Sequence, residues 1–300
     1  MQTFHELLNG FLKFQEPKSS WVVYRRLCTQ HFDGWPAHPT YAEIEDWHRN
    51  LIAVPHLANK GLAFLKAMYT WGMRRGQYPG PNPATGVKQH RTFSRDRVMT
   101  EPEIAILFGC LDMLPQKMGA LALLLLTTGC RLSEALAMRE EDLNMQTGEW
   151  VQLKTKNGRA HMTYVPEQAR AALRLLVKKH GWFFAGAYEH HWSRAGAEKV
   201  WWEVRGSLGL SDVRLHDFRR TLATHLYRAT KDEYLVKRCI NHVNRNVTAI
   251  YVRISHEEVA SALQAQADRF MALTPTNGGL QGHLMTRHVS RPTHYERSLT

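Results

Sequence analysis

The 300-residue sequence carries 39 lysines and arginines against 27 acidic residues, a net charge of +12, and 44% of its residues are hydrophobic. This hydrophobic content supports a folded core and excludes wholesale disorder, and the length allows one large domain or two ordinary ones. The positive charge favours an acidic partner, nucleic acid before an anionic membrane, although a basic protein that merely stays soluble has the same charge.

A membrane location and a disulfide framework are both disfavoured. The longest apolar run covers residues 118–126, about half the length of a spanning helix. The first residues lack the basic start and small-residue cleavage site of a signal peptide. The four cysteines lie far apart without a CxxC pair, which is typical of a reducing compartment. We therefore expect a cytoplasmic protein.

Residues 1–86 are predicted to form an N-terminal helical domain. Thr40 and Glu43 have the spacing of a capping box and precede apolar residues at helical intervals. Another apolar helical face follows over residues 57–71. The Gly- and Pro-rich stretch at 76–86 is incompatible with a continuing helix.

Residues 87–99 are predicted to be a basic interdomain linker. Its positive side chains, opposed only by Asp96, are Lys88, Arg91, Arg95 and Arg97. Such runs contact nucleic acid or are simply solvated, and about half of them touch nothing.

Residues 100–273 are predicted to form a second, mostly helical domain. Thr100 and Glu103 form another capping-box pattern, and residues 121–126 are apolar all round, which indicates a buried helix. Around residues 149–166 the apolar period changes and flanks a turn-like Lys-Asn-Gly, which predicts a short β-hairpin.

The C-terminal part is predicted to contain one more helix and a tail. Residues 256–270 are amphipathic, and this helix packs either on its own domain or on a neighbouring protomer. Residues 274–300 show no apolar period, and we expect a flexible tail there.

The segment Thr-Gly-Cys-Arg-Leu-Ser-Glu, residues 128–134, places an arginine at a helix start. A buried helix breaks at Gly129, and Arg131 stands near the beginning of the next helix, where anions are favoured. Glu134 lies on the same helical face and can hold the guanidinium. An ordinary surface ion pair is the alternative interpretation.

Two further segments place titratable side chains at suggestive spacings. His216 and Arg219 share one face of a predicted helix whose opposite face is apolar. His242 is followed nine residues later by Tyr251, with a polar turn between them. Each pattern alone is of modest specificity, since most tyrosines are simply half-buried with the hydroxyl in water.

Taken in order, TGxRxxE, HxxR and a histidine followed nine residues later by tyrosine resemble the tyrosine recombinase, or phage integrase, family. The similarity covers residues 98–255, and residues 40–86 resemble the family's helical core-binding domain more loosely. The resemblance implies a mostly α fold with a small β-hairpin or sheet in the catalytic domain. It also implies two domains that clamp duplex DNA.

The resemblance implies a catalytic set. Arg131 and Arg219 would grip the scissile phosphate, His216 and His242 would flank it, and Tyr251 would be the nucleophile. The family's hairpin lysine is assigned to Lys156, with Lys154 as the alternative on the same strand face, and Glu134 would support Arg131. The candidate DNA contacts are Lys88, Arg91, Arg95, Arg97, Arg220 and Arg245. One departure is Asn241, which stands where relatives usually have glycine.

The chemistry of these residue types suits phosphodiester cleavage. Two guanidinium groups neutralise the charge that develops on the phosphate oxygens. A tyrosine hydroxyl has a pKa of about 10 and needs a positive surround and a base, for which His216 is the best candidate. No metal-binding motif is present in the sequence, so we expect neither a metal nor a cofactor.

The implied function is site-specific DNA recombination through a 3′-phosphotyrosine intermediate, for integration or excision of a phage or mobile element. The implied partners are double-stranded DNA with specific sites and further copies of the chain, as a dimer at each site and a tetramer in synapsis. A DNA-bending accessory protein is a further candidate, and the setting would be a bacterial nucleoid or a phage-infected host. A type IB topoisomerase and a non-catalytic DNA-binding regulator are the alternatives.

Overall fold

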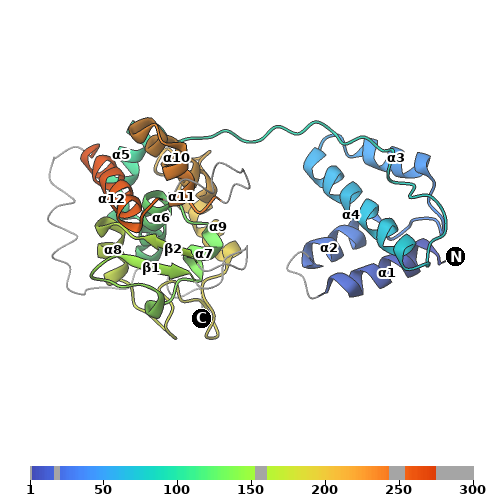
Figure 1. Cartoon of the computed structure of the whole chain (residues 1–300), viewed down its shortest axis with the longest axis horizontal. Helices are drawn as coiled ribbons and strands as arrows, with labels where there is room; N and C mark the ends of the chain where they lie inside the picture. The colour runs from blue at the N-terminus through green and yellow to red at the C-terminus, as the bar shows by residue number, and fades with distance from the viewer. Residues whose placement is uncertain (1, 17–20, 153–160, 243–253, 275–300) are drawn as a thin grey trace. The chain divides into compact units, whose positions relative to one another are not determined.

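The computed structural model describes residues 2–16, 21–152, 161–242 and 254–274. Their contacts divide the chain after Arg95 into two compact units, an N-terminal unit (Met1–Arg95) and a C-terminal unit (Asp96–Thr300), both drawn in Figure 1. Within the described ranges the regular structure is helical except for one two-stranded sheet. The predicted mostly helical fold with a small β element is therefore confirmed.

The N-terminal unit is built on an aromatic core. It contains α1 (Phe4–Gln15), α2 (Trp21–His31), α3 (Tyr41–Asn50) and α4 (Pro55–Arg74). The long α4 packs against the other three helices. The buried rings at its centre include Phe4, Phe11, Phe32 and Phe64. The predicted capping box is present at the start of α3, where the side chains and backbones of Thr40 and Glu43 bond reciprocally.

The N-terminal unit includes the first part of the predicted linker, where His90 is held by side chains of α3 and α4. The side-chain amide of Asn59 accepts from the His90 backbone N–H at 2.9 Å and donates to the His90 carbonyl at 2.8 Å. The His90 ring stacks on the ring of His48, with centroids 4.0 Å apart. This paired contact fixes the first part of the 87–99 segment on the N-terminal unit.

The other end of the segment is fixed on the C-terminal unit through Arg97. Its Nε donates to Asp212 Oδ2 at 2.7 Å, and its Nη1 donates to Glu103 Oε2 at 3.0 Å. Two residues on, the Met99 N–H donates to the buried Thr221 hydroxyl at 2.9 Å. The stretch between the two anchored ends is therefore residues 91–96.

The C-terminal unit is organised around the apolar helix α6. Its first half contains α5 (Glu101–Gly109), the 3₁₀ turn η1 (Leu111–Met113), α6 (Gln116–Thr128), α7 (Leu132–Leu136), the 3₁₀ turn η2 (Glu140–Asp142), β1 (Glu149–Gln152) and β2 (His161–Tyr164). Its second half contains α8 (Glu167–Arg174), α9 (Arg194–Val204), α10 (Leu215–Thr230), α11 (Glu233–Cys239) and α12 (His256–Ala272).

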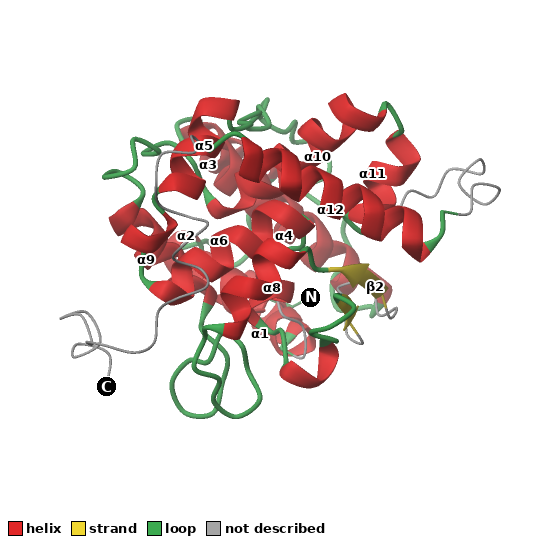
Figure 2. Ribbon diagram, turned by 90° about the vertical axis from the view of Figure 1, so that its left-hand side faces the viewer, coloured by secondary structure: helices red, strands yellow, loops and turns green. Residues whose placement is uncertain are grey.

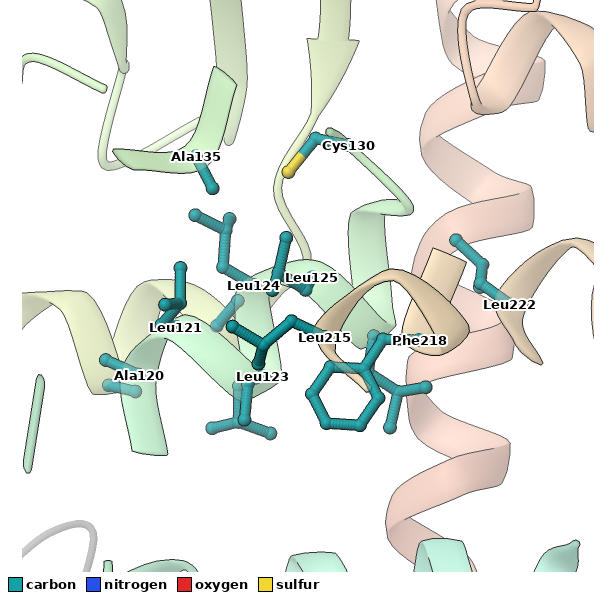
Figure 3. Packing of buried hydrophobic residues seen from close by; sticks show 14 of the residues in the cluster. Ala120, Leu121, Leu123, Leu124, Leu125, Cys130, Ala135, Leu215, Phe218 and Leu222 are labelled. Atoms are coloured by element: carbon teal, nitrogen blue, oxygen red, sulfur yellow. The ribbon is translucent and has the colours of Figure 1, made fainter. Parts of the chain in front are cut away.

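Helix α6 is buried on every side, as its sequence predicts. Residues 118–128 of α6 are all buried, and α10, α8, α12, α7 and α9 pack around it. Figure 3 shows its leucines beside Leu215 and Phe218 of α10. The helix that carries the predicted HxxR motif is thus attached directly to the centre of the core.

Strands β1 and β2 pair antiparallel in the predicted hairpin, with Trp150 opposite Thr163 and Gln152 opposite His161. Trp150 is fully buried, which fixes one face of the hairpin against the core. The turn and both candidate lysines, Lys154 and Lys156, lie outside the described residues.

Helix α12 packs within its own chain. Val259, Leu263 and Phe270 are buried in the core of the C-terminal unit, and Figure 2 shows α12 alongside β2. A polar seam adds to this contact, because Gln264 Oε1 accepts from the Glu167 N–H at 2.9 Å. In this single chain the helix lies on its own domain, and docking on a neighbouring protomer stays a prediction.

Candidate active site

The chain turns sharply between α6 and α7 at a position that only glycine fits. Gly129 ends α6 with φ +62°, in the left-handed region. A Cβ atom there would lie 2.8 Å from Leu222 Cδ2 and 2.9 Å from Ile240 Cγ2. The predicted helix break at Gly129 is confirmed, and it brings Arg131 to the start of α7 beside α10.

Arg131 is held by Glu134 as part of the helix start. Arg131 Nη1 donates to Glu134 Oε1 at 2.8 Å, and the Arg131 backbone N–H donates to Glu134 Oε2 at 2.8 Å. The Glu134 side chain is only 9% exposed and that of Arg131 is 26% exposed. This is a fixed, desolvated pair and not a flexible surface ion pair, so the guanidinium has a defined orientation.

Arg219 lies deep in the same region. Helix α10 starts where the Arg214 N–H donates to the buried Asp217 carboxylate at 2.8 Å, and Phe218 anchors its apolar face. Arg219 is 8% exposed, and its Nη1 donates to the Gly129 carbonyl at 2.7 Å. Burial lowers the pKa of Arg219, and the charge of the nearby Arg131 lowers it further.

These two arginines create an unbalanced positive site. No carboxylate in the described ranges forms an ion pair with Arg219, and the single carboxylate of Glu134 is taken by Arg131. A buried cation is costly unless an anion completes the site. The arrangement of Arg131 and Arg219 is therefore suited to binding a phosphate.

His216 lies one turn before Arg219 on α10, with its side chain partly exposed. Partial burial lowers the pKa of His216, and the charges of Arg219 and Arg220 lower it further. A lowered pKa leaves the imidazole neutral at pH 7, so its ring can accept a proton.

The turn after α11 places His242 near Arg131. The Asn241 carbonyl accepts from Arg131 Nη2 at 3.4 Å, and the His242 N–H donates to the Lys237 carbonyl at 2.8 Å. Asn241 has φ +51°, in the left-handed region where glycine is the least strained residue. Asparagine tolerates this region better than most other residues, which explains the departure from the family's glycine.

Replacing Asn241 tests this backbone requirement. We expect Asn241→Gly to unfold at a denaturant concentration close to that of the wild type, and Asn241→Val to be less stable by about 1–2 kcal/mol, because valine is strained at positive φ. Urea unfolding followed by circular dichroism measures both. Equal stability of the two variants would contradict a fixed left-handed turn at this position.

The other predicted site residues lie either outside the described ranges or in the 87–99 segment. Tyr251 and Arg245 lie outside the described residues, as do both candidate lysines. Lys88 and Arg91 are exposed, whereas Arg97 is held by the carboxylates of Glu103 and Asp212. These ion pairs give the Arg97 guanidinium a fixed position, and its role as a DNA contact stays a prediction.

One pair of residues beside this site could not be predicted from the sequence. His161, the first residue of β2, is 8% exposed, and its Nδ1 lies 3.1 Å from Arg238 Nη1 at the end of α11. The charges of Arg131 and Glu134 both act on the His161 ring. No local motif marks this contact, because it joins residues 77 positions apart through the strand register.

Within the described ranges, no three His, Cys, Asp or Glu side chains are grouped so that they could hold a metal ion. Nor does any helix there combine the length and apolar character that a membrane span requires.

Comparison with known proteins shows relatives among recombinases. The profile of the phage integrase family matches residues 97–258. Tyrosine recombinase XerS of Streptococcus equi subsp. zooepidemicus is 31% identical over 156 residues, which are 48% of this chain and 44% of the relative. Tyrosine recombinase XerC of Roseiflexus castenholzii is 27% identical over 146 residues, 45% and 46% of the two chains. The chain therefore spans less than half the length of these curated relatives.

Solved integrases share the fold. A lambda integrase (residues 75–356) dimer bound to a COC′ core site has a TM-score of 0.68 at 16% identity, covering 84% of this chain and 99% of that one. The Tn1549 transposon integrase in complex with a circular intermediate DNA has a TM-score of 0.64 at 15% identity, covering 90% and 99%. The family profile covers more than half of the chain, and the chain belongs to the phage integrase family.

Proposed function

We propose that this protein is a site-specific DNA recombinase that cleaves and rejoins DNA strands with Tyr251 as nucleophile. The observation that carries the proposal is the pair of the half-buried Arg131 and the buried Arg219, because within the described ranges no carboxylate is paired with Arg219. A phosphodiester is the DNA group that such a site would neutralise.

The reaction follows from the residues assigned to it. The Tyr251 oxygen attacks phosphorus, the bond to the 5′ oxygen breaks, and the 3′ phosphate remains on the tyrosine. His216 takes the phenolic proton, and Lys156 or Lys154 gives a proton to the departing oxygen. The arginines stabilise the extra charge in the transition state, and His242 donates a hydrogen bond to the same phosphate. Rejoining reverses these steps, so no ATP is consumed.

The finer biological role is part of the same proposal. Solved relatives include a lambda integrase dimer on a core site and a lambda integrase tetramer bound to a Holliday junction. By analogy, we propose a dimer at each site, a tetramer in synapsis, and integration or excision of a phage or mobile element in the bacterial nucleoid. An accessory DNA-bending protein remains a candidate partner. The candidate DNA contacts in the proposal are Lys88, Arg91, Arg95, Arg97, Arg220 and Arg245.

The test is strand exchange. Duplexes that the full chain selects from a random pool supply its site, and two labelled duplexes with this site are then incubated with the protein and EDTA, without ATP. We expect joined products that carry both labels. Relaxation of a supercoiled plasmid that lacks the site, without joined products, would instead indicate a topoisomerase. Tight binding with neither product would indicate a regulator.

A further inference from the structure

Arg238 is oriented by a neutral partner. Its guanidinium has only donors, so the 3.1 Å contact makes His161 Nδ1 the acceptor and leaves the ring proton on Nε2. Burial lowers the pKa of His161 to about 4, and the charge of Arg238 contributes to this shift. The ring is therefore neutral at physiological pH, and protonation does not break the contact there.

A neutral acceptor fixes a guanidinium without cancelling its charge. Arg97 and Arg131 are held by carboxylates, but no carboxylate in the described part of the chain forms an ion pair with Arg238. Residues 153–160 join β1 to β2, and residues 243–253 lie between α11 and α12. The sequence of neither stretch contains an Asp or Glu. Their lysines and arginines are Lys154, Lys156, Arg159, Arg245 and Arg253.

Arg238 also lies beside the arginine site. Arg131 donates to the carbonyl of Asn241, three residues after Arg238, and Arg131 acts electrostatically on the His161 ring that Arg238 contacts. Arg238 is half-buried, so its guanidinium is restrained but still reachable by a ligand.

We propose that Arg238, oriented by His161, binds a DNA backbone phosphate next to the one that Arg131 and Arg219 hold. Arg131 and Arg219 already supply enough donors for the scissile phosphate, so Arg238 would bind a neighbouring phosphate. This inference rests on the proposed function, because it takes the arginine pair as the centre of the DNA site.

The first experiment measures binding of the full chain to a 30-base-pair duplex of random sequence as salt is raised. Each phosphate contact contributes about 0.9 to the slope of log affinity against log salt. We expect Arg238→Gln to lower the steepness by about this amount and to bind about tenfold more weakly. The matched control is Arg174→Gln, which loses the same charge from an arginine paired with Glu167 on α8, and which should keep the wild-type slope.

Variants of His161 test the orientation. Asparagine places an amide oxygen near the position of Nδ1, so His161→Asn is expected to keep the wild-type slope. His161→Leu removes the acceptor, so it should lower both the affinity and the steepness of the salt slope, as Arg238→Gln does. Arg238→Lys keeps the charge and should keep the slope, and thermal unfolding of every variant identifies any loss of fold. A wild-type slope in His161→Leu would overturn the orienting role.

The second experiment locates the phosphate. Neutral methylphosphonates replace, one at a time, the phosphates that flank the cleavage position in the selected duplex. We expect wild type and Arg238→Gln to bind one of these substituted duplexes with equal affinity. At that position the neutral methylphosphonate has already removed the charge that Arg238 would contact. A constant difference at every position, or equal slopes for Arg238→Gln and Arg174→Gln, would overturn the proposal. If wild type binds normally but forms no covalent complex, the recombinase proposal fails while these slopes still report on Arg238.

Discussion

The Tyr251→Phe variant is expected to bind its selected duplex with unchanged affinity and to form no covalent protein–DNA complex. Phenylalanine keeps the ring and removes only the hydroxyl that would attack phosphorus. The measurement uses a nicked duplex, in which cleavage releases a short fragment and prevents rejoining, followed by a denaturing gel. Wild type should accumulate a shifted protein band.

The control for this experiment is Tyr227→Phe. Tyr227 is a half-exposed tyrosine of α10 that has no part in the proposed site, so its variant should yield as much adduct as wild type. An equal yield from Tyr251→Phe and wild type would exclude Tyr251 as the nucleophile.

The Arg219→Lys variant is expected to cleave the nicked duplex about 100- to 1,000-fold more slowly than wild type, with a smaller loss of affinity. Arg219 donates to the Gly129 carbonyl with one nitrogen, and no other acceptor among the described residues takes its remaining donors, which could bind a phosphate. A lysine ammonium is a single compact point of charge and cannot reproduce this divided, planar geometry.

The matched control is Arg228→Lys, because Arg228 is an exposed arginine of the same helix. It should cleave at the wild-type rate. Unfolding measurements accompany both variants, since a buried Gly129 carbonyl left without a donor costs about 1–3 kcal/mol. Normal cleavage by Arg219→Lys would show that this arginine does not grip the phosphate.

Features set by local spacing could be predicted from the sequence. The capping boxes at Thr40 and Thr100 depend on residues three positions apart, and both are present. The break at Gly129 and the Arg131–Glu134 contact are equally local, because both involve only neighbouring turns of helix. Their physical cause is contained in a few consecutive residues, so a single sequence reveals them.

Features set by distant partners could not be predicted in the same way. The sequence shows that Arg97 is charged, but it does not show that Arg97 pairs with Asp212, which is 115 positions away. The contact of His161 with Arg238 depends on the register of a strand and on the packing of α11. The roles of Tyr251 and Lys156 stay predictions, because both residues lie outside the described part of the chain.

The anchoring of both ends of the 87–99 segment limits how far apart the two units can move. Between His90 and Arg97 there are seven peptide steps, which span at most about 25 Å when fully extended. If both units bind DNA, as we propose, a tether this short gives the second unit an effective concentration in the millimolar range once the first has bound a duplex. Under the proposed function the chain would then act as a bivalent ligand, in which the DNA contacts of the two units reinforce each other.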